Sequence, residues 1–203
     1  MINTIVFDMG NVLIRYAPTE FIKSFTEDET SQQLLLYAIF LSDEWLDYDR
    51  GTITKEKLIA TAQDRVPEDL KPSIPRLMDT WFENMMPIAG MEEILHKLKS
   101  NGYQLLLLSN VSQDFHQFKA VIPGIELFDG LFLSSDWKCI KPDTVIYEQF
   151  FAHFDLNPAD CFFIDDLAMN IEGAAKLGMT GHVFDGNLTK LEVSLKNAGI
   201  RLS

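Results

Sequence analysis

The amino-acid sequence predicts an α/β fold in which a parallel sheet is covered by helices on both faces. Short apolar runs alternate with helical patterns from residue 87 to the carboxyl end, an order typical of parallel strands joined by crossover helices. One more strand, residues 4–7, comes first and is separated from the others by helical patterns alone. Three of the apolar runs end in polar residues, as expected where a parallel sheet carries its chemistry at the carboxyl edge.

Residues 18–82 form the helical part of the chain. Residues 31–41 carry apolar side chains close to the helical period, which predicts one helix. Thr54 is a plausible N-cap for another helix, and residues 75–85 form a further apolar-faced helix. Residues 47–51, which contain two aspartates and a glycine, mark a break between two of these helices.

From residue 87 onward, helices and strands are expected to alternate. Ser112 is a plausible N-cap, and Gly178 is placed to end a helix. We expect strands over residues 104–108, 131–133, 161–164 and 182–184. We expect helices over residues 90–100, 112–120, 143–154, 170–177 and 188–197.

The composition limits the size, the location and the partners that we expect for this protein. With 203 residues, of which 47% are hydrophobic, the chain is long enough for one core domain plus an insertion. No apolar run approaches the roughly 20 residues that span a bilayer, and no basic segment indicates a signal peptide. The two cysteines form no disulfide framework, so we expect a cytoplasmic protein. A net charge of −13 argues against nucleic acid and membranes as partners.

Polar residues suited to chemistry follow the apolar runs. A carboxylate placed at the end of a buried strand and before a glycine turn, as Asp8 is, is costly for structure alone. Because strand ends of a parallel sheet meet at one edge, the later polar residues are expected to lie near it. In chain order the set is Asp8, Ser109 with Asn110, Lys141 before a proline, and Asp165 with Asp166.

This ordered set resembles the haloacid dehalogenase-like hydrolase superfamily, most of whose members are Mg²⁺-dependent phosphatases. The resemblance covers essentially the whole chain. It implies a Rossmann-like catalytic core made of residues 1–16 and 87–203, with the first strand at the centre of the sheet and Asp8 at the topological switch point. It also implies that residues 17–86 form a small all-helical cap domain over the active site.

The resemblance implies a role for each residue of the set. Asp8 is expected to attack phosphorus and form an aspartyl-phosphate, which water then hydrolyses. Lys141 is expected to neutralise charge on the phosphoryl group and on Asp8. Ser109, Asn110 and Asn11 are expected to bind the phosphoryl oxygens.

Mg²⁺ is the expected cofactor, because adjacent carboxylates at a buried strand end repel each other unless they share a cation. The resemblance implies that the ligands are Asp8, Asp166, Asp165 and the backbone carbonyl of Gly10. Asp166 is expected to bind directly, and Asp165 either directly or through water. Asn170 is expected to orient Asp165 or the metal-bound waters.

Gly10 departs from the usual pattern of the superfamily, whose phosphatases carry a general acid and base aspartate at this position. A glycine here resembles a subgroup that includes sugar-1-phosphate phosphatases, whose leaving group needs less protonation. We therefore expect a phosphomonoester hydrolase of small phosphorylated metabolites, with a hexose phosphate such as glucose 1-phosphate as one candidate. A haloacid dehalogenase, a phosphomutase and a catalytically weak binding protein are the alternatives.

Substrate choice is expected to depend on the helical insertion. Trp45, Tyr48 and Arg50 lie around the break at residues 47–51 and could form a loop tip that faces the sheet. The aromatic pair could then stack on a sugar, and Arg50 could bind hydroxyl or phosphate groups. In the alternative interpretation, Trp45 and Tyr48 pack the insertion's own core and Arg50 is exposed.

Overall fold

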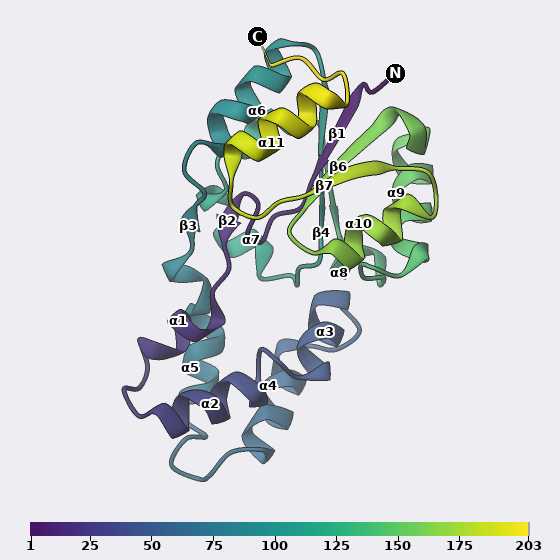
Figure 1. The fold of residues 1–203 in the computed structure, drawn as a ribbon. Coiled ribbons are helices and arrows are strands. Elements are labelled where there is room, and N and C mark those ends of the chain that lie inside the picture. The colour runs from purple at the N-terminus through teal and green to yellow at the C-terminus, as the bar shows by residue number, and fades with distance from the viewer. Residues whose placement is uncertain (203) are drawn as a thin grey trace.

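The computed structural model describes residues 1–202 and shows a five-stranded parallel sheet beside a group of helices (Figure 1). The strand order is β5-β4-β1-β6-β7, so β1 lies at the centre. Successive connections run outward from β1 in both directions, which makes the carboxyl end of β1 the topological switch point. The predicted α/β fold class is confirmed. The strands are β1 (Thr4–Phe7), β4 (Gln104–Ser109), β5 (Gly130–Leu133), β6 (Cys161–Asp165) and β7 (Thr180–Val183).

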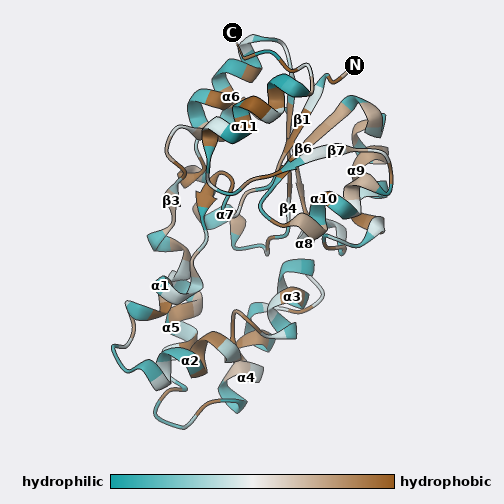
Figure 2. Ribbon diagram, in the orientation of Figure 1, coloured by the Kyte–Doolittle hydropathy of each residue, from teal (hydrophilic) through white to brown (hydrophobic). Residues whose placement is uncertain are grey.

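Alternate residues of the sheet point into two separate apolar cores, as the period of two along a strand requires. In β1, Ile5 and Phe7 enter one core and Val6 enters the other. Helices α6 and α11 cover the first core, and α9 and α10 cover the second (Figure 1). In Figure 2, α6 and α11 carry both hydrophobic and hydrophilic residues, as helices with one buried face do. Their bounds are α6 (Met91–Ser100), α9 (Thr144–Phe154), α10 (Ala168–Ala175) and α11 (Leu188–Asn197).

Between β1 and β4 the chain forms a helical insertion, connected to the sheet by a short antiparallel ribbon of β2 (Ile14–Arg15) and β3 (Met86–Pro87). The insertion lies beyond the carboxyl ends of the strands, with α3 nearest to the sheet (Figure 1). No helix within residues 1–202 is long and apolar enough to cross a membrane. The helices of the insertion are α1 (Pro18–Lys23), α2 (Glu29–Ala38), α3 (Asp43–Arg50), α4 (Lys55–Asp64), α5 (Ser73–Thr80) and a 3-10 turn, η1 (Trp81–Asn84).

Several predicted elements differ from those observed. The ribbon of β2 and β3 and the short helix α8 (Ser134–Trp137) were not predicted, because two to four residues carry no periodic signal. The helix predicted over residues 112–120 is limited to α7 (Phe115–Phe118), followed by a 3-10 turn. The Ser112 side chain accepts a hydrogen bond from Asp114, which forms a turn before α7 rather than a helix cap.

Candidate active site

Three of the predicted residues meet because their strands are neighbours. Asp8 directly follows β1, Ser109 ends β4 and Asp165 ends β6. Phe7 of β1 is in register with Leu107 of β4 and with Ile164 of β6. All three polar residues are buried at the carboxyl edge of the sheet. The parallel register therefore assembles the centre of the site.

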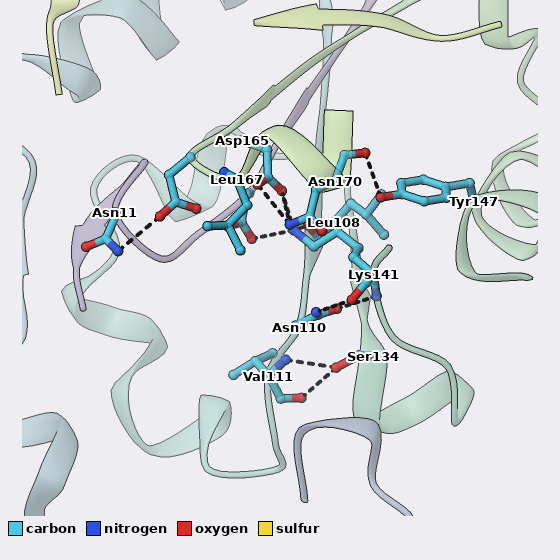
Figure 3. A network of polar contacts seen from close by, with 12 residues as sticks. Asn11, Leu108, Asn110, Val111, Ser134, Lys141, Tyr147, Asp165, Leu167 and Asn170 are labelled. Atoms are coloured by element: carbon cyan, nitrogen blue, oxygen red, sulfur yellow. Dashed lines mark hydrogen bonds and ion pairs between the residues drawn. The ribbon is translucent and has the colours of Figure 1, made fainter. Parts of the chain in front are cut away.

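Lys141 joins Asp8 to Asp165. Its Nζ lies 2.8 Å from Asp8 Oδ1, and it donates to Asp165 Oδ2 at 2.7 Å and to the carbonyl of Leu108 at 3.0 Å (Figure 3). Its side chain is 1% exposed. Burial alone would lower the pKa of Lys141, but Asp165 and Asp8 outweigh burial and raise it. A cation is therefore fixed beside the carboxylate at the switch point.

Asn110 holds Lys141 in place. Its side-chain amide donates to the carbonyl of Lys141 at 3.0 Å and accepts from the backbone N–H of Lys141 at 2.8 Å (Figure 3). The side-chain amide that was expected to bind phosphate is thus engaged with the backbone of Lys141, and phosphate binding by Asn110 stays a prediction. This reciprocal pair fixes the backbone at Lys141, and therefore the point from which its buried side chain starts.

Asp165 and Asp166 have different surroundings. The two oxygens of Asp165 accept hydrogen bonds from Lys141, from Asn170 and from the backbone N–H of Leu167 (Figure 3). Asn170 thus fills the first of its two expected roles, the orientation of Asp165. Asp166 is only partly buried and faces the cavity described below.

Asn11 supports Asp166. Its side-chain N–H donates to Asp166 Oδ2 at 3.1 Å, and its Oδ1 accepts from the backbone N–H of Tyr16 at 3.0 Å. Asn11 has a φ of 53°, in the left-handed region that asparagine tolerates better than most residues. The side chain expected to bind phosphate is therefore engaged in positioning a carboxylate.

The three carboxylates form a donor set that fits a divalent cation. One oxygen from each of Asp8, Asp165 and Asp166 lies within 4.8 Å of the others. Burial raises the pKa of Asp8 to about 7 against the attraction of Lys141, and the charge of Asp165 acts in the same direction as burial. Burial also raises the pKa of Asp166, while its hydrogen bond from Asn11 acts in the opposite direction. A bound cation would favour the ionised form of these groups.

A cavity of about 320 Å³ opens above the cluster. One part of its wall is polar and belongs to the sheet edge, and the other part is largely apolar. The polar lining consists of Asp8, Asn11, Ser109, Asn110, Lys141, Asp166 and Asn170. The remaining lining consists of Met9, Gly10, Ile14, Tyr16, Trp45, Asp49, Trp81, Met85, Val111 and Leu167.

The break expected at residues 47–51 is instead the last turn of α3. The Ser42 side chain caps the helix by accepting from the N–H of Trp45, and Gly51 ends it with a φ of 74°. Trp45 packs against Trp81 with ring centroids 5.3 Å apart, and Tyr48 is buried beside it. Tyr48 therefore packs in the insertion's own core, as in the alternative interpretation. Trp45 belongs both to this aromatic cluster and to the cavity wall.

Arg50 lies outside the cavity lining. Its guanidinium donates to Asp47 at 2.8 Å on the surface of α3. The structure thus does not bring Arg50 together with the other predicted residues. Lys138, a second lysine near Lys141 in sequence, donates to the carbonyls of Gly51 and Ser135 and joins α3 to α8 instead.

Sequence reasoning missed several residues of the cavity wall, among them Tyr16, Asp49, Trp81 and Met85. One signal was available, since Trp45 and Asp49 are four residues apart and share one face of a helix. Burial raises the pKa of Asp49 well above its ordinary value, and the charges of Asp114 and Asp8 act in the same direction. A carboxyl group on the insertion, with a raised pKa, therefore borders the site.

The fold and the site define an α/β enzyme of the hydrolase type, with its carboxylates and lysine at the switch point of a parallel sheet. The family model of the haloacid dehalogenase-like hydrolases matches residues 2–178, and the chain belongs to this family. The superfamily expected from the sequence is confirmed.

Known relatives differ in the reactions that their names state. The chain is 28% identical over 195 residues to the sesquiterpene phosphatase astK of Aspergillus oryzae, covering 93% of each chain. It is 30% identical over 131 residues to (S)-2-haloacid dehalogenase 4A of Burkholderia cepacia, covering 64% of this chain and 56% of the relative.

A solved structure supports the fold independently. A haloacid dehalogenase-family enzyme from Bacteroides thetaiotaomicron, in complex with magnesium and inorganic phosphate, matches with a TM-score of 0.68. The two sequences are 21% identical, and the match covers 94% of this chain and 99% of that chain.

Proposed function

We propose that the protein is a Mg²⁺-dependent phosphomonoester hydrolase that acts through Asp8. The observation that carries this proposal is the position of Asp8 at the switch point, 2.8 Å from a buried lysine and inside a cluster of three carboxylates. The phosphatase relative in Aspergillus oryzae and the magnesium and phosphate bound to the Bacteroides enzyme support the same reaction class.

Asp8, Asp166 and the backbone carbonyl of Gly10 would hold the Mg²⁺ ion, with Asp165 contributing directly or through water. Hard oxygen donors of this kind suit Mg²⁺, which usually keeps several waters. When bound, the ion neutralises charge on the carboxylates and on the phosphate oxygens. Asp165 also has a second task, since it fixes the ammonium group of Lys141.

In the proposed reaction, an oxygen of Asp8 attacks phosphorus in line and the ester bond to the leaving group breaks. Water then attacks the aspartyl-phosphate, releasing inorganic phosphate and restoring Asp8. Lys141 is placed to attract both the phosphoryl oxygens and Asp8, which aligns the two. Ser109, buried at the end of β4 and lining the cavity, would donate its hydroxyl to a phosphoryl oxygen.

The acidic cluster favours phosphate chemistry over the alternatives. Halide displacement needs no cation, so a dehalogenase gains nothing from gathering Asp8 with Asp165 and Asp166. A phosphomutase usually needs the aspartate that Gly10 replaces. The intact carboxylate and lysine cluster also argues against a protein that only binds.

The apolar wall favours a substrate whose organic group is apolar. Trp45, Trp81 and Met85 offer surface to a hydrocarbon chain or an aromatic ring. A hexose would need hydrogen-bond partners for several hydroxyl groups, and on this side of the cavity the insertion supplies mainly Asp49. The sesquiterpene named for one relative is a molecule of the apolar kind.

Hydrolysis of p-nitrophenyl phosphate tests the reaction. Activity should require Mg²⁺ and be lost on chelation, and Asp8→Asn should lower kcat by about 10⁴-fold because it removes the nucleophile while nearly preserving its shape. Asp185→Asn, which changes an exposed carboxylate paired with Lys190, is the matched control. An Asp8→Asn protein that keeps a tenth of the activity would exclude the covalent mechanism.

A substrate panel tests the apolar class. We expect kcat/KM for farnesyl phosphate to exceed that for glucose 1-phosphate by at least about tenfold, because burial of apolar area is worth about 25 cal/mol per Å². A 2-haloacid serves as the dehalogenase probe in the same assay. A preference for the sugar phosphate would restore the hexose hypothesis, and release of halide would favour the dehalogenase.

A further inference from the structure

The nucleophile loop of this protein lacks a proton donor. Gly10 stands where a carboxyl group would be needed on that loop, and it offers only backbone atoms. An alcohol leaving group of high pKa still has to be protonated as its bond to phosphorus breaks. Such a donor has to come from another element that borders the cavity.

Asp49 borders the same cavity as Asp8 but belongs to the insertion. Asp8 lies at the sheet edge, whereas Asp49 lies on α3, which faces the carboxyl ends of the strands (Figure 1). In-line attack by Asp8 places the leaving oxygen on the side of phosphorus that points away from Asp8. The insertion faces the sheet edge, so we expect the leaving oxygen to point toward the insertion. Trp45, one turn earlier on the same face of α3, borders the same cavity.

The backbone around Asp49 is attached to the core. The hydroxyl of Ser134 donates to the carbonyl of Asp49. The same hydroxyl accepts from the N–H of Val111 at 2.8 Å (Figure 3). Gly51 lies two residues after Asp49, and its carbonyl accepts a hydrogen bond from Lys138 Nζ at 2.6 Å. The end of α3 is thus fixed to the loops after β4 and β5, which are parts of the site.

Two acidic groups and two hydrogen-bond donors act on the carboxyl group of Asp49. Asp8 acts on it from the sheet edge, and Asp114 from the turn before α7. Asp114 is itself paired with Lys55 of α4 at 3.0 Å, so that cation is engaged elsewhere. Tyr16 also lies close, since the charge of Asp49 raises its pKa in addition to burial. Burial and these charges raise the pKa of Asp49, against hydrogen bonds from Ser112 and Trp45 that lower it, and a raised pKa is the direction that a general acid requires.

We propose that Asp49 donates the proton to the leaving group and so replaces the general acid that is absent at Gly10. The proposal rests on the proposed function. As Asp8 forms its bond to phosphorus, the ester P–O bond breaks and its electron pair stays on the leaving oxygen. That oxygen takes the proton from Asp49, and an alcohol departs. In the second half, Asp49 takes a proton from the attacking water, phosphate leaves, and Asp8 and Asp49 return to their first states.

The test measures how rate depends on the leaving group. The substrates are p-nitrophenyl, phenyl and benzyl phosphate, which have similar size and leaving groups of rising pKa. Asp49→Asn should lower kcat/KM for benzyl phosphate by about 10²–10⁴-fold and for p-nitrophenyl phosphate by less than about threefold. Asp47→Asn, a partly exposed aspartate on the same helix, is the control and should leave all three rates unchanged.

Each outcome decides the proposal. Equal losses for the three substrates would make Asp49 a binding or structural residue, and unchanged rates would give it no role. The wild-type series is a second measurement, independent of how the variant folds: a steep fall from p-nitrophenyl to benzyl phosphate would show that no proton is donated. If the wild-type protein hydrolyses none of the three, the proposed function itself fails.

Discussion

Without metal, the protein should lose stability as the pH rises, because Asp8 is buried. Its pKa is about 7 in the folded protein, against an ordinary value of 3.8, since burial outweighs the attraction of Lys141. Between these values the folded protein keeps a proton that the unfolded chain releases. The stabilisation from this proton is complete below the unfolded pKa of 3.8 and is lost as the pH rises through 7.

The size of the effect follows from the two pKa values. One pKa unit corresponds to about 1.4 kcal/mol, so the full change in the free energy of unfolding is about 4 kcal/mol. About 3 kcal/mol of this change falls between pH 5 and pH 8. Lys141 does not alter this range, because its raised pKa contributes stability that is lost only above its ordinary value of 10.5.

Urea denaturation of wild type and Asp8→Asn in a chelating agent measures the effect. The difference between the two proteins cancels the titrating groups that lie away from Asp8. We expect the free energy of unfolding of Asp8→Asn, relative to that of the wild type, to rise by about 3 kcal/mol from pH 5 to pH 8. Mg²⁺ at a hundred times its Kd should raise the free energy of unfolding of the wild type by about 2.7 kcal/mol. Parallel pH curves for the two proteins would refute the assignment of a neutral, buried Asp8.

Two further changes test the metal site and the attachment of the insertion. Asp166→Asn should raise the Mg²⁺ concentration needed for half-maximal activity by about 10–100-fold, and an unchanged metal titration would remove Asp166 from the ligand set. Gly51→Ala should lower the free energy of unfolding by about 1–3 kcal/mol, because Gly51 has a φ of 74° and an added Cβ would lie 2.4 Å from the carbonyl oxygen of Ser135. Wild-type stability in a urea titration would contradict that prediction.

The sequence by itself determined the fold and the centre of the site. Strand-length apolar runs alternating with helices allow few topologies other than a parallel sheet. Once the sheet is parallel, residues that follow neighbouring strands have to meet at one edge. The proximity of Asp8, Ser109 and Asp165 therefore follows from their places at the ends of apolar runs.

Only the tertiary structure decided how the remaining polar side chains are used. Asn110 and Asn11 lie where phosphate-binding residues were expected, yet their amides hold the backbone of Lys141 and the carboxylate of Asp166. An amide bonds with whichever partner the folded loops bring within about 3 Å, and loops carry no periodic pattern that predicts this distance.

Which side chains of the insertion face the site also could not be predicted from the sequence. Arg50 and Asp49 are adjacent in sequence, and only Asp49 lines the cavity. Successive residues of an α-helix point about 100° apart, so the sequence could not tell which of them faces the sheet before the extent of α3 was known. The Ser42 cap and the turn at Gly51 set the ends of α3. Its orientation toward the sheet depends on the hydrogen bonds from Ser134 and Lys138, which form only when the insertion packs on the core.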